Sequence, residues 1–306
     1  MERDKCTLCP RSCKADRADG QKGYCGADKN IKVARASLHM WEEPCISGTN
    51  GSGTVFFSGC PLKCIYCQNK KIADGNKGRV LTTGKLSKLF LLLQSKGASN
   101  INLVTPTHFT PQIAQAIEQA KKDGLTLPIV YNTSGYEKTE TLKYLDGLVD
   151  IYLPDLKYKS VELSSKYSNA PDYFETAAAA VSEMVRQTGK PVFDDSGLMR
   201  KGTIVRHLVL PSHTKDSKDI ISYLYNTYKN DIYVSIMSQY TPLANSLQFP
   251  NLSRRVTKRE YDKVVDYAIS LGVENAFIQE GRAAEESFIP DFDDGGFLDE
   301  LQELYF

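Results

Sequence analysis

The cysteines are the residues best suited to chemistry, and all eight lie in the first 67 positions of this 306-residue chain. Cys60, Cys64 and Cys67 form a Cys-x3-Cys-x2-Cys loop directly after the apolar run Thr54–Ser58. Three thiolates on one short loop can hold three irons of a cubane iron–sulfur cluster, because cysteine thiolate is the usual ligand of such clusters. The fourth iron would stay open to a small chelating molecule, as the open position of a catalytic metal site does. The alternative is a zinc site with a borrowed fourth ligand, or three unrelated buried thiols.

Four further cysteines precede this loop and form a separate candidate ligand set. They are Cys6, Cys9, Cys13 and Cys25. Zinc bound by four thiolates would fold a segment too short for its own core, and four cysteines also complete a second iron–sulfur cluster. We favour a structural metal here, with zinc ahead of iron–sulfur, and treat electron relay by this segment as a hypothesis. Cys45 stands alone, and we expect it to be buried.

Composition and charge exclude several classes of function. The 38 Lys and Arg residues balance 37 Asp and Glu residues, so no strong field draws the chain to nucleic acid or to an acidic membrane. The longest purely aliphatic or aromatic run, Leu89–Leu93, is too short to span a bilayer, and the charged start at Met1–Pro10 does not resemble a signal peptide. We therefore expect a cytoplasmic, monomeric protein with no nucleic-acid or membrane partner.

From about residue 48 onward, short apolar strands alternate with amphipathic helices. The predicted strands are Thr54–Ser58, Ile101–Thr105, Pro128–Asn132, Asp150–Leu153, Thr203–Leu210, Ile232–Met237 and Asn275–Ile278. The predicted helices are Lys85–Ser95, Thr110–Asp123, Thr139–Leu145, Asp172–Thr188, Lys215–Tyr228 and Lys258–Leu271. This alternation predicts an α/β fold with a parallel sheet, and the number of units favours a partial (β/α)6-type TIM barrel. Chemistry in such barrels lies at the carboxyl ends of the strands.

The composition divides the chain into three parts. Residues 1–47 form a cysteine-rich metal-binding segment, and residues 48–282 form the partial barrel. Residues 283–306 form an acidic tail, which we expect to pack Phe288, Phe292 and Phe297 against the barrel.

The three-cysteine loop resembles the hallmark of the radical SAM superfamily, in which an aromatic residue stands where this chain has Tyr66. The wider resemblance covers residues 48–282 and is similar to the branch of glycyl-radical activases such as pyruvate formate-lyase activating enzyme. Its motifs here are Gly51 to Cys60, Asp155-Leu156-Lys157, and Val205-Arg206 to Pro211. The chain most resembles an activase-like set of unestablished substrate that also carries a cysteine-rich amino-terminal segment.

This resemblance implies a reaction. S-adenosylmethionine chelates the open iron of a [4Fe-4S] cluster, an electron breaks its sulfonium C–S bond, and a 5′-deoxyadenosyl radical abstracts hydrogen from a substrate. The leading hypothesis is activation of a glycyl-radical enzyme, and the second is modification of a small molecule or peptide. A hypothesis of another class is a non-catalytic iron–sulfur electron-transfer protein. The basic amino-terminal segment is suited to dock an acidic flavodoxin- or ferredoxin-like reductant.

The resemblance also suggests residues that bind the cofactor. It pairs Lys157, near Asp155, with the methionine carboxylate of S-adenosylmethionine, which suits a cation at a strand end. Arg206 lies inside an apolar strand, so it needs an anionic ligand or an acidic structural partner. His207 faces the opposite side of that strand and is expected to be a packing residue.

The sequence departs from the superfamily at the second strand. A Gly-Gly-Glu-like motif is replaced by Thr105-Pro106-Thr107-His108, where the two threonines can offer hydroxyls to the cofactor. His108 is a candidate catalytic proton donor or substrate contact. Polar candidates at the other strand ends are Asn132, Ser134, Gln239 and Tyr240.

Overall fold

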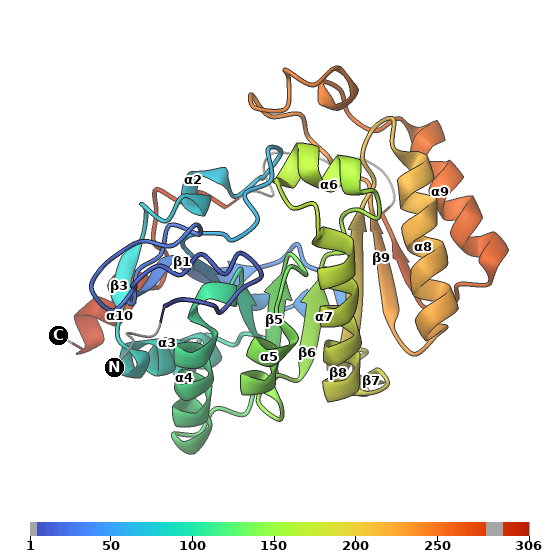
Figure 1. Cartoon of the computed structure of the whole chain (residues 1–306). Coiled ribbons are helices and arrows are strands. Elements are labelled where there is room, and N and C mark those ends of the chain that lie inside the picture. Colours follow the sequence, from blue (N-terminus) through green and yellow to red (C-terminus); the bar gives the residue numbers. More distant parts are fainter. Residues whose placement is uncertain (1–4, 280–289, 306) are drawn as a thin grey trace.

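A computed structural model describes residues 5–279 and 290–305, and its described strands form one ten-stranded sheet (Figure 1). The strands are β1 (Ile31–His39), β2 (Ser52–Phe57), β3 (Arg79–Leu81), β4 (Ile101–Val104), β5 (Ile129–Thr133), β6 (Ile151–Pro154), β7 (Val192–Phe193), β8 (Met199–Leu208), β9 (Tyr233–Met237) and β10 (Ala276–Ile278). Their order is β10-β9-β8-β6-β5-β4-β2-β1-β3, with β7 paired to β8.

The sheet is mostly parallel and open. Strands β2, β4, β5, β6, β8, β9 and β10 pair in parallel, whereas β1 pairs antiparallel with both β2 and β3. The two ends of the strand order, β10 and β3, do not pair with each other. This arrangement confirms the predicted α/β class and the partial barrel.

Helices follow most of the parallel strands and cover the outer face of the sheet (Figure 1). The helices are α1 (Pro44–Ser47), α2 (Lys70–Ala73), α3 (Thr83–Ser95), α4 (Thr110–Lys122), α5 (Thr139–Leu142), α6 (Val161–Ser168), α7 (Tyr173–Thr188), α8 (Thr214–Tyr228), α9 (Lys258–Leu271) and α10 (Leu298–Tyr305). Short 3-10 turns lie at Thr107–Phe109, Lys143–Leu145 and Pro250–Leu252. No helix within residues 5–279 and 290–305 has the length and apolar character needed to cross a membrane.

The central strands are buried on both faces. Every residue of β2, β4, β5 and β6 is buried, as expected for a parallel sheet covered by helices. Polar residues lie at the carboxyl end of these strands or directly after it, as Asn132 and Thr133 in β5 and Asp155 after β6 do, so the sequence places polar groups at one edge of the sheet.

The segment before residue 48 contributes a strand to the sheet. Residues 31–39, which the sequence assigned to the cysteine-rich segment, form β1 and pair with β2 along its length. Burial alternates along β1 on either side of an irregularity between Val33 and Arg35, where the register with β2 shifts, so that Ile31, Val33 and Ala36 are all buried.

The described part of the acidic tail, residues 290–305, packs against strands β1, β2 and β3. Phe292 is buried against Phe56, with ring centroids 5.4 Å apart, and the backbone N–H of Phe297 donates to the carbonyl of Ala36 over 2.8 Å. Ion pairs join Asp293 to Lys71 and Lys77, Asp294 to Arg35, and Asp299 to Arg79. Phe288, the third aromatic residue expected to pack here, lies outside the described residues.

His207 is a packing residue whose burial should make stability depend on pH. Burial lowers its pKa to about 4, although Nδ1 lies 2.8 Å from the carbonyl oxygen of Leu156. Below pH 6.5 the imidazole of His207 is protonated in the unfolded chain but stays neutral in the folded chain. The free energy of unfolding therefore decreases as the pH falls toward 4. We expect His207→Gln to escape this loss and to gain about 3 kcal/mol relative to wild type between pH 7 and pH 4. Anaerobic urea unfolding at several pH values checks this, and a pH-independent difference between the two proteins would contradict it.

Candidate active site

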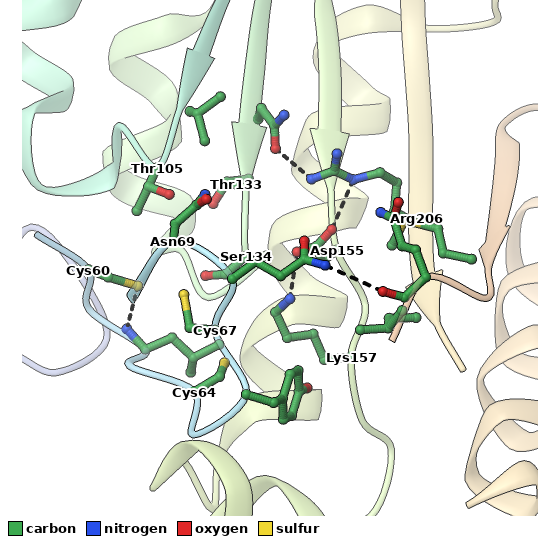
Figure 2. A pocket seen from close by; sticks show the side chains of 18 of the residues that line it. Cys60, Cys64, Cys67, Asn69, Thr105, Thr133, Ser134, Asp155, Lys157 and Arg206 are labelled. Carbon is green, nitrogen blue, oxygen red and sulfur yellow. Dashed lines mark hydrogen bonds and ion pairs between the residues drawn. The ribbon is translucent and has the colours of Figure 1, made fainter. Parts of the chain in front are cut away.

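One pocket gathers side chains from the carboxyl ends of β2, β4, β5, β6, β8 and β9 (Figure 2). Twelve of the residues selected from the sequence line it: Cys60, Cys64, Tyr66, Cys67, Thr105, Asn132, Ser134, Asp155, Lys157, Arg206, Gln239 and Tyr240. They converge because parallel strands all end at the same edge of the sheet.

The cysteine loop leaves β2 through a sharp turn at Gly59. The φ angle of Gly59 is +96°, and a Cβ atom there would lie 2.6 Å from the carbonyl oxygen of Cys25. Only glycine suits this left-handed and crowded position. The turn directs Cys60, Cys64 and Cys67 toward one end of the pocket, where Figure 2 shows their sulfur atoms.

Two of the three thiols accept hydrogen bonds from neighbouring groups. The backbone N–H of Leu62 donates to Cys60 Sγ over 3.4 Å, and the Ser168 hydroxyl donates to Cys64 Sγ over 3.0 Å. Burial raises the pKa of the Cys67 thiol to about 12, with the neighbouring Cys60 and Cys64 adding to the effect. Such buried thiols become thiolates by binding metal, and hydrogen bonds to sulfur are how proteins tune iron–sulfur clusters.

The donor set fits a cubane cluster. Within the described ranges, no three His, Cys, Asp or Glu side chains are arranged to hold one metal ion. A cubane needs no such convergence, because each thiolate binds a different iron. Cys60, Cys64 and Cys67 are therefore suited to hold three irons of a [4Fe-4S] cluster.

A network of charged side chains forms the opposite wall of the pocket (Figure 2). Asp155 accepts hydrogen bonds from Lys157 Nζ over 2.6 Å and from Arg206 Nε over 2.9 Å. The Arg206 guanidinium also donates to Asn132 Oδ1 over 2.6 Å and pairs with Glu42 Oε2 at 3.1 Å. All four charged side chains are at most 16% exposed, so their pairing is little screened by solvent.

Ion pairing and burial together set the pKa values of the carboxyl groups in and beside this wall. Burial would raise the pKa of Asp155, but Lys157 and Arg206 outweigh it and hold the pKa below its usual value. Burial raises the pKa of Glu42 despite the nearby Arg206. Burial also raises the pKa of Glu43, whose Oε2 is buried with no hydrogen-bond partner. Asp155 is therefore the carboxylate that remains ionised beside Lys157.

Glu42 is a site residue that the sequence analysis missed. It lies in the loop after β1, and its Oε1 accepts hydrogen bonds from Asn102 at 3.0 Å and from Asn132 at 3.2 Å. The signal that could have found it is the alternating run of β1 followed by two adjacent acids. Other lining residues not anticipated from the sequence include His39, Trp41, Asn69, Thr133, Leu208, Met237 and Thr241.

Tyr66 is the start of a chain of buried hydroxyls that leads back to Cys64 of the cysteine loop. Its hydroxyl is 2.5 Å from that of Tyr158, which lies 2.9 Å from the hydroxyl of Ser168, the donor to Cys64. The Tyr66 ring meets Tyr240 edge-on. The aromatic residue of the motif thus fixes the loop position and also lines the pocket.

The two threonines of the turn after β4 differ in position: Thr105 lines the pocket, and Thr107 does not. Thr105 lines the pocket with a φ of +57°, an uncommon conformation for a β-branched residue that marks local strain at the site. Thr107 lies outside the pocket lining, and its hydroxyl bonds to the buried carboxylate of Glu137 at 2.6 Å. The cofactor contact expected of Thr107 therefore has no support in its position.

His108 also lies outside the pocket lining. It is 1% exposed, and its Nε2 is 2.7 Å from the carbonyl oxygen of Ser58. Burial lowers its pKa to about 4. A neutral, enclosed ring is suited to support the end of β2, so the position of His108 does not add support to the predicted role of proton donor.

The amino-terminal cysteines contact the cysteine loop through the backbone of Cys25. The carbonyl of Cys25 accepts a hydrogen bond from the backbone N–H of Cys60 over 3.1 Å. Cys6, Cys9 and Cys13 lie near Cys25, close enough to influence one another electrostatically. Cys45 is buried in α1, as expected.

This chain is similar to a curated protein and to several solved structures. The protein MJ0674 of Methanocaldococcus jannaschii, described as uncharacterized, is 25% identical over 271 residues, covering 86% of this chain and 74% of that protein. The FeFe-hydrogenase maturase HydG from Carboxydothermus hydrogenoformans has a similar fold, with a TM-score of 0.52 and 14% identity over 78% of this chain and 55% of HydG.

Streptococcus suis SuiB bound to S-adenosylmethionine is also similar, with a TM-score of 0.49 and 14% identity over 73% of this chain and 49% of SuiB. The chain spans about half the length of these two solved structures. The family model described as the radical SAM superfamily matches residues 54–224, which is more than half of the chain and includes the cysteine loop together with Asp155, Lys157 and Arg206 of the charged wall. The chain therefore belongs to the radical SAM superfamily, which implies a [4Fe-4S] cluster and S-adenosylmethionine as cofactors.

Proposed function

We propose that this radical SAM enzyme abstracts hydrogen from a partner protein, with activation of a glycyl-radical enzyme as the specific reaction. The observation that carries the chemistry is the placement of three cysteines of one loop across a single pocket from the Asp155–Lys157–Arg206 wall. When bound, the cluster and S-adenosylmethionine supply a 5′-deoxyadenosyl radical. The chain itself supplies binding, orientation and exclusion of water.

Lys157 is the residue best placed to hold the methionine carboxylate. Its ammonium has three donor hydrogens, of which one bonds to Asp155. Its charge also favours the thiolate forms of Cys60, Cys64 and Cys67, so it lies near the cluster ligands. A cation between the cluster loop and Asp155 can meet an anionic group without losing its own partner.

The remaining polar groups suit the other parts of the cofactor. Thr105, Asn132, Thr133 and Ser134 lie at the ends of β4 and β5 and offer hydroxyl, amide and carbonyl groups within the pocket. Neutral groups of this kind can bind an amino group or a ribose without adding charge. Of these residues, Thr105 lies where the Gly-Gly-Glu-like motif of the superfamily would stand.

A protein substrate is supported by the shape of the mouth. The sheet does not close between β10 and β3, and the lining residue Trp41 is 60% exposed at the pocket. A sheet that is open among its described strands and an exposed aromatic ring suit a loop of another protein, because aromatic residues are enriched among the residues that dominate binding energy at protein interfaces. A small molecule or peptide is the competing substrate class.

The first prediction concerns cleavage of S-adenosylmethionine. After anaerobic reconstitution and reduction with dithionite, wild-type protein should form 5′-deoxyadenosine, and Cys64→Ala should form none because one iron loses its ligand. Cys45→Ala is the matched control, since this thiol is buried away from the pocket, and it should behave as wild type. Mass spectrometry of the nucleoside measures the outcome. An intact cluster without nucleoside and without cofactor binding would support the electron-transfer hypothesis instead.

The second prediction concerns Lys157. Lys157→Met should weaken binding of S-adenosylmethionine by about tenfold to a hundredfold, because a hydrogen bond to a charged group contributes about 1.5–3 kcal/mol. Equilibrium binding to the reconstituted protein measures this, and iron content shows whether the cluster survives. Lys159→Met removes a nearby lysine outside the pocket lining and should leave binding unchanged. Equal affinity of Lys157→Met and wild type would exclude the carboxylate contact.

The third prediction separates the substrate classes. Incubating the reduced enzyme and S-adenosylmethionine with a glycyl-radical enzyme should produce a glycine-centred doublet in the electron paramagnetic resonance spectrum. Trp41→Ser should reduce the rate of this activation while leaving 5′-deoxyadenosine formation without substrate unchanged. Absence of the doublet from a protein that cleaves S-adenosylmethionine would redirect the search to small molecules and peptides.

A further inference from the structure

The segment of residues 5–30 lacks the means to fold on apolar contacts. It contains no helix or strand, and it is held by turns such as those closed by Cys6 and Ala15. Its buried side chains are Cys9, Ala15, Arg17, Cys25 and Ala27. None of these is a large hydrophobic residue, so another source of stability must hold the segment in place.

The thiols of this segment gather around Gly23. A Cβ atom at Gly23 would lie 3.1 Å from Cys13 Sγ and 3.5 Å from Cys25 Sγ. Cys6 and Cys9 lie close enough to Cys25 to influence it electrostatically. The thiols of Cys13 and Cys25 thus lie beside Gly23, with those of Cys6 and Cys9 nearby.

Arg17 supplies the second, independent observation. Its side chain is buried, and it donates to the carbonyls of Asp28 and His108 and to Cys6 Sγ at 3.8 Å. No carboxylate among the described residues pairs with it. A buried guanidinium requires a nearby negative charge. A centre with four thiolates carries net negative charge and would supply it.

We propose that Cys6, Cys9, Cys13 and Cys25 bind a second metal centre through four thiolates, and that this centre holds the cluster loop in position. The metal is thiophilic, either a zinc ion or a second cubane cluster. The sulfur atoms do not converge on one ion position. A cubane accepts spread ligands, whereas zinc requires rotamer changes that the exposed Cys13 and the half-buried Cys6 permit.

The second centre is joined to the cluster loop by backbone contacts. The Cys25 carbonyl receives the N–H of Cys60, and Arg11 donates to the carbonyls of Pro61, Leu62 and Ser168. Ser168 is also the hydroxyl donor to the thiol of Cys64. Ordering the amino-terminal segment therefore orders the start of the cysteine loop at Cys60–Leu62 and, through Ser168, its centre at Cys64.

Metal analysis of a variant that lacks the first site tests the proposal without relying on activity. The triple variant Cys60→Ser, Cys64→Ser, Cys67→Ser should retain one zinc ion per chain when purified, or one cubane after anaerobic reconstitution. Adding Cys25→Ser should remove that metal, whereas adding Cys45→Ser should not. Elemental analysis distinguishes zinc from iron, and either result supports the proposal. A triple variant with neither metal, or one whose four thiols form disulfides, would overturn it.

Hydrogen exchange tests the positional role. In the triple variant, loss of the second centre by Cys25→Ser should speed exchange of the loop amides around Cys60 and Leu62 by about tenfold or more. Amides in α9, on the far side of the sheet order, should not change. Since the triple variant cannot cleave S-adenosylmethionine, these results do not depend on the proposed reaction. Unchanged exchange in the loop after metal loss would show that the centre does not position it.

Discussion

The burial of one guanidinium, that of Arg206, organises this active site. A cation inside a barrel strand is tolerated only when opposite charges and hydrogen bonds compensate for its lost hydration. Its partners come from three separate parts of the chain: Glu42 follows β1, Asn132 ends β5, and Asp155 follows β6. Neutralising Arg206 therefore draws the loop after β1 over the strand ends. It also orients Asp155, which in turn holds Lys157.

This network separates the roles of two cations that the sequence could not tell apart. Arg206 uses Nε and both terminal nitrogens on protein acceptors, so it acts as a structural cation. Lys157 donates one of its three ammonium hydrogens to Asp155, and the other two can bond to a ligand. Removing a partner from a buried pair costs about 3–5 kcal/mol, so Asp155 keeps Lys157 charged and fixed before any ligand arrives. Electrostatic preorganisation of this kind lowers the cost of binding an anionic group.

The sequence predicted the barrel well because buried strands and half-buried helices differ in their pattern of apolar residues. Strands such as Ile101–Val104 and Ile151–Pro154 are short apolar runs between amphipathic helices, and each ends where polar residues begin. Strand β1 was missed because it lies among cysteines and turns and pairs antiparallel, outside the repeating pattern. Glu42 was missed with it. Thr107 and His108 were assigned to the pocket because their types suit chemistry, but sequence alone does not show which way a side chain turns after a strand.

The boundary drawn at residue 48 is compositional and not physical. His108 links the two sides: its ring contacts the Ser58 carbonyl at the end of β2, while its own carbonyl accepts from Arg17. Gly59 allows the Cys25 carbonyl to approach the loop where any side chain would collide with it. These polar groups are buried, and each would cost free energy if its partner were removed. The amino-terminal segment and the cluster loop therefore form one cooperative unit, so the barrel residues alone do not contain all the contacts that position the catalytic cysteines.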